Sequence, residues 1–365
     1  MKNFILAFVI VLPLATTAQK KVDLDRYNFT AQFRALPQIR LDTNYRTYNV
    51  KVSGTSMMQS IINEMNAEQT VELEGWKKLS SRGHITVDVK VDDILPEAVE
   101  VKERVEQIKD KNGKITGQRV YYRQEVVYTF AVTAQITDYK GAHIREEQLV
   151  TRQSKKTYSG PEFPNRQIAS GYFLLNSIKV TKDLFKSNLN NALHNLSDRI
   201  SSNFGYRVVN VNDHMWIVDS RKHPEYDAHR QAFLKLNDIF FRMTADSPVD
   251  SLRKEAKPVI DYFEKIKRVY SSSSKHDRKI RYASYFNLAV LYYYLDDPQM
   301  MMKEAKGLVL NDFDAKDGKG FEQTARWLKD LFDQTNRYTR HFPMDIESFR
   351  GPYEKEVIVA DKASL

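Results

Sequence analysis

The chain contains no cysteine and only 13 glycines among its 365 residues. The absence of cysteine excludes disulfide bridges, thiol nucleophiles, thiolate metal sites and anchoring through a lipid-modified cysteine. The Walker A and G-x-G-x-x-G phosphate-binding loops are also missing, as is the G-x-S-x-G turn of many serine hydrolases. The sequence therefore does not support the common nucleotide-binding or serine-hydrolase classes.

What the chain does contain is typical of a folded protein, with 42% hydrophobic and 28% charged residues. This balance supports a sizeable core and excludes a wholly disordered chain. There are 56 Lys and Arg against 47 acids, a net charge of +9. Residues 102–123 hold seven Lys and Arg against three acids, and residues 263–282 hold seven against two. These stretches are either solvated faces or contacts with an anionic envelope surface or an acidic partner.

The amino terminus has the three parts of a secretory signal peptide. A short basic start precedes the apolar run Phe4–Leu14, and the small residues Ala15–Ala18 follow it. The alternative is a membrane anchor, but eleven apolar residues are too short to span about 30 Å of hydrocarbon. We therefore predict a signal peptide at 1–18 and an exported protein, periplasmic or peripheral to the outer membrane. No transmembrane helix is expected after cleavage, and export argues against nucleic acid as a partner.

Residues 45–158 have mainly the patterns of β-strands. From His84 to Ile94, apolar and polar residues alternate, which is typical of a half-buried strand. Asn112-Gly113 lies between two β-patterned runs and predicts a hairpin. The second of these runs, Val120–Ile136, is one long strand or two strands joined at a bulge.

A helix and two short strands are expected to complete this part of the chain. Thr181 is a plausible N-cap, an apolar stripe follows it, and Gly205 ends the helix. We predict an α+β domain at 22–220, an antiparallel sheet with one packed long helix. The order of elements over 45–218 resembles small periplasmic α+β modules such as the TolB amino-terminal domain.

After Pro224 the hydrophobic period changes from two to about 3.6 residues. Five apolar stripes, separated by short polar segments, predict five antiparallel helices. We therefore expect an all-α domain at 225–340, followed by an irregular tail at 346–365.

Residues 276–310 resemble a tetratricopeptide-type helical hairpin. The first helix matches that repeat's aromatic, leucine, small and aromatic positions at Tyr285, Leu288, Ala289 and Tyr292. The second helix departs from the pattern at Met301 and Ala305. The resemblance implies binding of a peptide or protein, or a scaffolding role.

Candidate catalytic and metal-binding residues are sparse. His223, Asp227 and His229 are close in sequence, but their spacing matches no known metal site, and a polar linker explains them as well. The adjacent acids Asp296 and Asp297 precede a proline and are typical of a helix-ending turn. We therefore predict no catalytic residues, no metal and no cofactor, and a protein that is not an enzyme.

The candidate partner site lies on the tyrosine-rich helix of the predicted hairpin. Tyr293 and Tyr294 lie off the apolar stripe by about 100° per residue, so at least one is expected to reach another surface. With Lys279 and Arg281, they form a candidate site for an acidic or aromatic partner. The alternative is that both tyrosines cover a neighbouring helix.

These patterns predict a secreted, non-catalytic binding or assembly component of the cell envelope. Its partner would be an envelope protein, bound through the helical domain, or an anionic envelope surface. The competing class is a hydrolase that acts on an envelope polymer or glycan, which would need two facing carboxylates. The sequence identifies neither the partner, nor the pathway, nor the oligomeric state.

Overall fold

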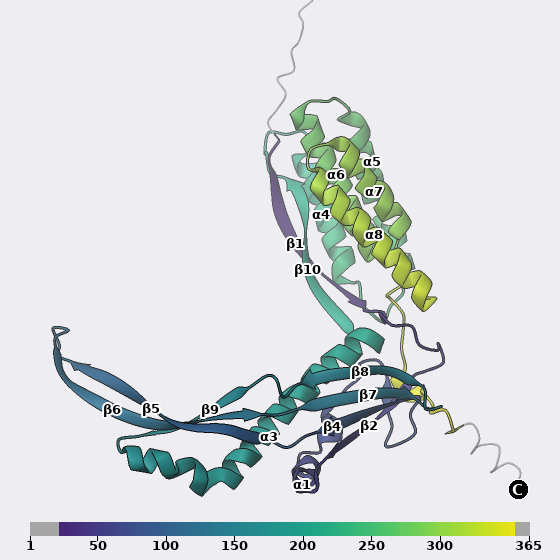
Figure 1. Cartoon of the computed structure of the whole chain (residues 1–365). Helices are drawn as coiled ribbons and strands as arrows, with labels where there is room; N and C mark the ends of the chain where they lie inside the picture. Colours follow the sequence, from purple (N-terminus) through teal and green to yellow (C-terminus); the bar gives the residue numbers. More distant parts are fainter. Residues whose placement is uncertain (1–21, 355–365) are drawn as a thin grey trace, which may run out of the picture. The chain divides into compact units, whose positions relative to one another are not determined.

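A computed structural model describes residues 22–354, which form two compact units (Figure 1). The sheet unit contains residues 34–208 and 343–354, and the helical unit contains residues 22–33 and 209–342. The predicted signal peptide at 1–18 and the last eleven residues of the tail lie outside the described residues. The predicted α+β class, with antiparallel sheets and a long helix followed by further helices, is confirmed.

The sheet unit contains a five-stranded sheet in the order β3-β2-β4-β7-β8. Its strands are β2 (Thr47–Gly54), β3 (Lys77–Lys78), β4 (Ile85–Val91), β7 (Val132–Asp138) and β8 (His143–Val150). Strand β4 pairs antiparallel with β7, as expected, but β2 is parallel to both β3 and β4. The helices α1 (Ser56–Glu64) and α2 (Ala67–Thr70) lie in the connection that the parallel pairing of β2 and β4 requires.

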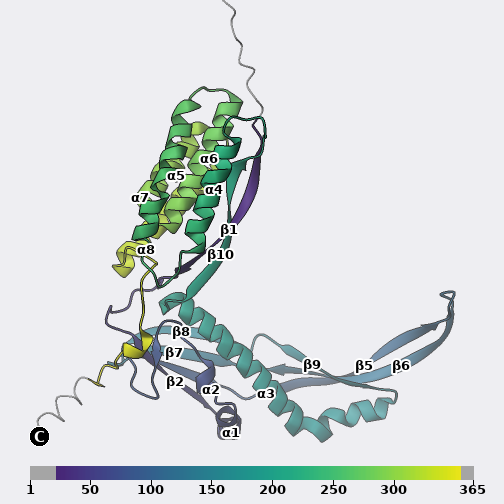
Figure 2. The same cartoon turned by 180° about the vertical axis from the view of Figure 1, so that it is seen from behind.

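A second sheet of three strands contains the predicted hairpin. It pairs β5 (Leu95–Lys109) with β6 (Ile115–Thr129), and β6 with β9 (Lys156–Phe163). At the turn, Gly113 has a φ of 81°, and the carboxylate of Asp110 accepts hydrogen bonds from the backbone N–H groups of residues 112 and 114. The far part of β5 and β6 extends as a two-stranded arm (Figure 2).

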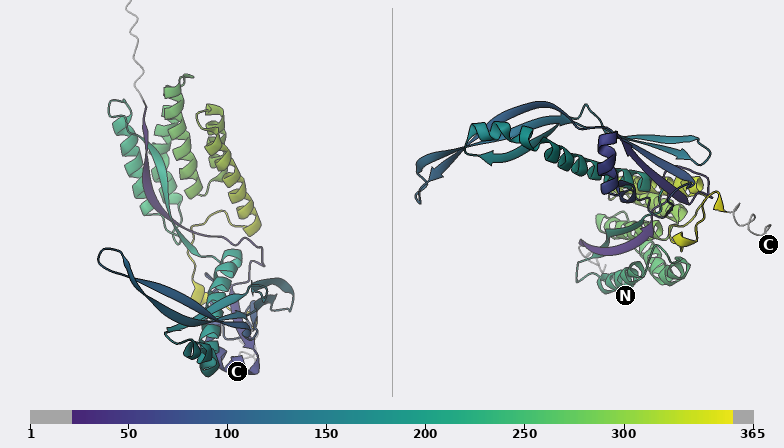
Figure 3. Two further views of the ribbon diagram at one scale, coloured as in Figure 1. Left: turned by 60° about the vertical axis from the view of Figure 1, so that its left-hand side comes forward. Right: turned by 90° about the horizontal axis from the view of Figure 1, so that it is seen from below.

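The long helix α3 (Arg166–Phe204) packs against strands of both sheets (Figure 3). It begins at Arg166 rather than after Thr181, because Asn165 accepts hydrogen bonds from the backbone N–H groups of Gln167 and Ile168 at 2.7 and 3.4 Å. The second half of α3 buries the predicted stripe, which includes Phe185, Leu189, Leu193, Leu196 and Ile200. The first half has apolar residues on two faces and therefore shows no single stripe in the sequence.

The described part of the tail packs on the sheet unit. It contains the short 3-10 helix η1 (Ile346–Ser348) and no longer element. The ammonium of Lys77 on β3 donates to the carbonyl oxygen of Glu347 at 2.7 Å. The hydroxyl of Tyr353 donates to the carbonyl oxygen of Tyr139 at 3.3 Å. These contacts attach the irregular segment to the five-stranded sheet and the loop after β7.

The helical unit contains five helices and a two-stranded ribbon within the described residues (Figure 1). The helices are α4 (Tyr226–Phe241), α5 (Asp250–Val269), α6 (Lys275–Tyr294), α7 (Pro298–Asn311) and α8 (Ala315–Thr335). The ribbon pairs β1 (Leu24–Arg34) with β10 (Val208–Val218). Backbone hydrogen bonds link Asp219 to Asp23 at one end and Ala35 to Arg207 at the other, so the strands are antiparallel.

The ribbon and the helices share one core, which moves the domain boundaries away from the predicted ones. The ring of Phe29 on β1 stacks on Phe240 of α4 at 4.1 Å and meets Tyr294 of α6 edge-on. Met215 and Ile217 of β10 belong to the same cluster. Both ends of the predicted 22–220 domain therefore belong to the helical unit. The alternating pattern of each strand identified neither its distant partner nor the core against which it packs.

Candidate functional site

The two tyrosines of the predicted partner site lie inside the helical unit. Tyr294 is 3% exposed, and its hydroxyl donates to a carboxylate oxygen of Asp213 at 2.9 Å. Burial, followed by the nearby carboxylate, raises the pKa of this tyrosine. Tyr293 is half-buried between Phe33, which it meets edge-on, and the guanidinium of Arg340, 4.3 Å from its ring centre. The alternative was that both tyrosines cover a neighbouring helix: Tyr294 does meet Phe240 of α4, whereas Tyr293 packs on strand β1 and Arg340.

The two basic residues of the predicted site lie at the other end of α6. Fourteen residues separate Lys279 from Tyr293, which corresponds to about 21 Å along a helix. Lys279 is 3.8 Å from a carboxylate oxygen of Asp23. Arg281 donates to the side-chain oxygen of Asn311 on α7 at 2.8 Å and to carbonyl oxygens in the loop before α6. Arg281 therefore holds the helical hairpin together, and the four residues form no common site.

Two further polar positions from the sequence are part of the core. His229 lies on α4 with no exposed surface, rather than in a polar linker. Asp296, in the turn after α6, accepts hydrogen bonds from the Nε and backbone N–H groups of Arg340 at 2.6 and 2.5 Å. Both residues of this ion pair are fully buried. Within residues 22–354, no cluster of three or more His, Asp or Glu side chains could hold a metal ion.

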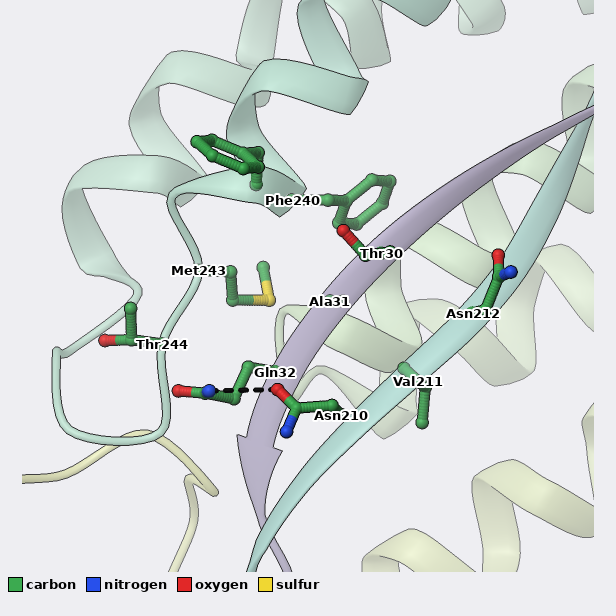
Figure 4. Close-up of a pocket in the computed structure, with 10 residues that line it drawn as sticks. Thr30, Ala31, Gln32, Asn210, Val211, Asn212, Phe240, Met243 and Thr244 are labelled. Atoms are coloured by element: carbon green, nitrogen blue, oxygen red, sulfur yellow. Dashed lines mark hydrogen bonds between the residues drawn. The ribbon is translucent and has the colours of Figure 1, made fainter.

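A hollow of about 410 Å³ lies beside the ribbon of the helical unit (Figure 4). It is lined from β1 by Thr30, Ala31 and Gln32, from β10 by Asn210, Val211 and Asn212, and from the end of α4 and the next turn by Phe240, Phe241, Met243 and Thr244. This group, the ribbon pocket, contains no ionisable side chain among its described lining residues. Its polar groups are amides and hydroxyls.

The ribbon pocket has one fixed polar side and one apolar side. The side-chain amide of Gln32 donates to the side-chain oxygen of Asn210 at 3.0 Å, while its oxygen accepts from the backbone N–H of Ala245, also at 3.0 Å. Gln32 is thus held at both ends. On the apolar side, Phe240 is buried, but the adjacent Phe241 is 77% exposed. Fixed amides beside an exposed aromatic ring suit a ligand with peptide-like donors and acceptors and an apolar side chain.

Sequence reasoning missed this pocket, although one signal for it was present. Phe240 belongs to the apolar stripe of its helix, so Phe241 is displaced by about 100°. The argument applied to Tyr293 and Tyr294 would have identified Phe241 as a surface aromatic. No sequence pattern predicts that Gln32 lies beside Asn210, because 178 residues separate them in the chain.

A second hollow, of about 620 Å³, lies over α5 and α7 and contains charged groups. The ammonium of Lys267 lies 2.6 Å from a carboxylate oxygen of Glu304 and 3.0 Å from one of Glu264. Burial raises the pKa of Glu304 despite this contact. At Glu264, burial acts in the same direction, but hydrogen bonds from Lys267 and Lys303 outweigh it and lower the pKa. The pKa values of the two carboxyl groups are therefore shifted in opposite directions, and the ammonium of Lys267 contacts both groups.

Comparison with known proteins identifies no family. No protein-family model and no curated protein matches the chain. Among solved structures, a minor lipoprotein from Acinetobacter baumannii matches with 13% identity and a TM-score of 0.22, over 45% of this chain and 96% of its own. A neuraminyllactose-binding hemagglutinin homolog from Helicobacter pylori matches with 11% identity and a TM-score of 0.20, over 43% of this chain and 94% of its own. Similarities at this level support no inference about function.

In the part of the chain that the structure describes, no helix combines the length and the apolar character that a membrane span requires.

Proposed function

We propose that the protein is an exported, non-catalytic binding component of the cell envelope that holds a segment of an envelope protein in the ribbon pocket. The observation that carries the proposal is the composition of that pocket. Neutral amides and hydroxyls line it, an aromatic ring stands exposed at its edge, and its described lining residues contain no acid or base to transfer a proton. The pattern of the first eighteen residues supports export.

The ribbon supports an extended peptide as the ligand. Within the described residues, β1 and β10 pair only with each other, so each strand has one edge without a strand partner. An extended segment can add to such an edge through backbone hydrogen bonds, while a neighbouring pocket receives one of its side chains. A pocket of about 410 Å³ is large enough for an aromatic or branched side chain. The helices behind the ribbon, including the proposed tetratricopeptide-type hairpin, would then serve as its rigid support.

The proposal is tested by recovery of the partner after cross-linking in the cell envelope. Phe241→Ala removes the exposed ring, and we expect at least a tenfold loss of recovered partner, as for an aromatic hot spot. Leu310→Ala is the matched control, because Leu310 is 84% exposed on α7 and lines the second hollow rather than the ribbon pocket. Both variants should melt like the parent protein. Equal recovery by the two variants would count against the ribbon pocket.

A second candidate function, hydrolysis of an envelope glycan, is favoured by Glu264 and Glu304. Two carboxylates whose pKa values are shifted in opposite directions are typical of acid and base pairs in hydrolases. The position of Lys267 between them opposes this role, because its ammonium occupies the space that a substrate would need. Release of reducing sugar from peptidoglycan by the parent protein, abolished in Glu304→Gln, would establish the hydrolase. We expect no release from either protein.

A further inference from the structure

The first half of α3, in the sheet unit, exposes a row of large apolar side chains. Leu174, Leu175 and Ile178 are 80%, 84% and 79% exposed, and Ile168 is 56% exposed. At about 100° per residue these four positions fall within a 120° arc, and they extend about 15 Å along the helix. We call them the α3 outer face. So many exposed apolar residues on one short face are unusual for a surface that meets only water.

The opposite face of the same segment packs against the three-stranded sheet. The helix is therefore not rotated so that its core-facing side points to solvent. Ala169 and Val180 are buried there. The buried side chain of Gln124 on β6 donates to the carbonyl oxygen of Ser170 at 2.9 Å and accepts from the backbone N–H of Phe173 at 2.7 Å. These two bonds fix the rotation of the helix on the sheet. The outer face is therefore held outward by the fold.

The charges around this face are basic. On the same helical arc, Lys179, Lys182 and Lys186 lie on or beside the outer face. Their acidic neighbours are Asp183, which contacts Lys179, and Glu64 of α1, which contacts Lys182 and Lys186. The adjoining three-stranded sheet and this segment together, residues 95–129 and 156–182, hold eleven Lys and Arg against seven acids, a net charge of +4. An exposed apolar helix face with basic residues beside it is the pattern of helices that lie on anionic bilayers.

A second copy of the chain fits this face less well. A two-fold interface places the same patch of both copies together. The lysines beside this face would then meet the same lysines of the other copy, and their two acidic neighbours, Asp183 and Glu64, are already in contact with them. An anionic lipid surface supplies the missing negative charge and an apolar layer beneath it.

We infer that the first half of α3 lies on an anionic phospholipid surface, with Leu174, Leu175 and Ile178 reaching the boundary of the acyl chains. Lys179 contacts Asp183 and Lys182 contacts Glu64 in the free protein, but all four side chains stay at least 42% exposed. Such exposed pairs are weak and can exchange for lipid phosphates. This docking surface belongs to the sheet unit and is independent of the peptide site proposed for the helical unit.

Vesicle flotation with the mature chain, residues 19–365, tests the inference. Vesicles of phosphatidylglycerol and phosphatidylcholine in equal parts should carry the protein, and vesicles of phosphatidylcholine alone should carry much less. The double variant Leu174→Ser/Leu175→Ser should lose roughly tenfold in bound fraction, because two apolar side chains no longer enter the bilayer. Higher salt should weaken binding of the parent protein.

Leu310→Ser is the matched control, because Leu310 is as exposed as Leu175 but lies on α7. The variants should have the circular dichroism and melting temperature of the parent, since exposed side chains contribute little to folding. Binding that is equal in the double variant and in Leu310→Ser would overturn the inference, as would equal binding to neutral and anionic vesicles. A concentration-dependent dimer that the double variant abolishes, without vesicle binding, would instead make the face an interface between copies.

Discussion

His229 shows how a single buried residue can tie stability to pH. Its ring packs against Phe263 at 5.2 Å and against Tyr262, and neither ring nitrogen has a hydrogen-bond partner among the described residues. Burial, with a smaller contribution from His223, lowers the pKa of His229 to about 3. In the unfolded chain an ordinary histidine titrates near a pKa of about 6.5. The folded protein therefore keeps His229 neutral where the unfolded chain would protonate it.

The sign of the resulting pH dependence follows from this lowered pKa. The contribution of His229 to stability is present above pH 6.5 and is lost as the pH falls toward about 3. Between pH 7 and pH 5, this residue alone should reduce the free energy of unfolding by about 2 kcal/mol. In His229→Leu that part of the slope should vanish. Urea unfolding at both pH values measures it, and parallel pH profiles for the two proteins would contradict the assignment.

At the residue scale, the sequence predicted which residues share one face of a helix better than it predicted which side chains reach solvent. The argument that one of Tyr293 and Tyr294 must leave the apolar stripe was sound as geometry. It failed as a prediction of a surface, because Phe33 of the ribbon and Arg340 cover Tyr293, while Phe29 of the ribbon and Phe240 of α4 cover Tyr294. Those covering groups lie 47 or more residues away in the chain, so no local pattern reports them. The same geometry applied to Phe241, which is 77% exposed, would have found a surface ring.

At the element scale, the contact between α6 and α7 depends on a glycine. A Cβ atom added at Gly307 would lie 2.2 Å from a ring carbon of Tyr285. Two non-bonded carbon atoms cannot approach each other so closely, so the ring or the helix would have to move. The ammonium of Lys267 also lies over the Tyr285 ring, 4.6 Å from its centre. Gly307→Ala should therefore destabilise the protein by about 1–3 kcal/mol, although alanine is the better helix former.

Gly320 on α8 provides the control for this substitution. An added Cβ there meets nothing within 4 Å. Gly320→Ala should consequently stabilise the protein by up to about 1 kcal/mol through helix propensity alone. Chemical unfolding of both variants separates packing from propensity. If Gly307→Ala were as stabilising as Gly320→Ala, the close packing of α7 on α6 would be wrong.

Elements with local signals were predicted, and elements defined by distant partners were not. The hairpin of β5 and β6 was found because Asn112-Gly113 determines its own turn. The start of α3 was missed because its first half carries apolar residues on both faces, so only the later stripe stood out. Strand β1 was missed although Tyr27, Phe29, Ala31 and Phe33 alternate with polar residues. Strand β10 was predicted as two short strands, Tyr206–Val211 and Met215–Val218, and placed with the wrong core, since the sheet unit separates it in the chain from its partner β1.

At the scale of the whole molecule, the division into units makes a prediction about Phe29. This residue is 2% exposed and packs on Phe240 and Tyr294, so Phe29→Ala should cost about 3–5 kcal/mol. Hydrogen exchange should accelerate in the helices α4–α6 and leave α3 unchanged. Phe130→Ala removes a fully buried ring that packs on Phe185 of α3. This variant should accelerate hydrogen exchange in α3 and leave α4–α6 unchanged. Acceleration in α3 by Phe29→Ala would restore the single 22–220 domain that the sequence suggested.

The most direct test of the proposed binding role is photo-cross-linking from Phe241 in living cells. A photoreactive phenylalanine analogue at position 241 should give one dominant adduct with an envelope protein, and the same analogue at position 310 should not. Sequencing the adduct should place the cross-link in an extended segment of the partner. Identical adducts from both positions, or none from position 241 in a folded and exported protein, would contradict the claim that the ribbon pocket binds a partner.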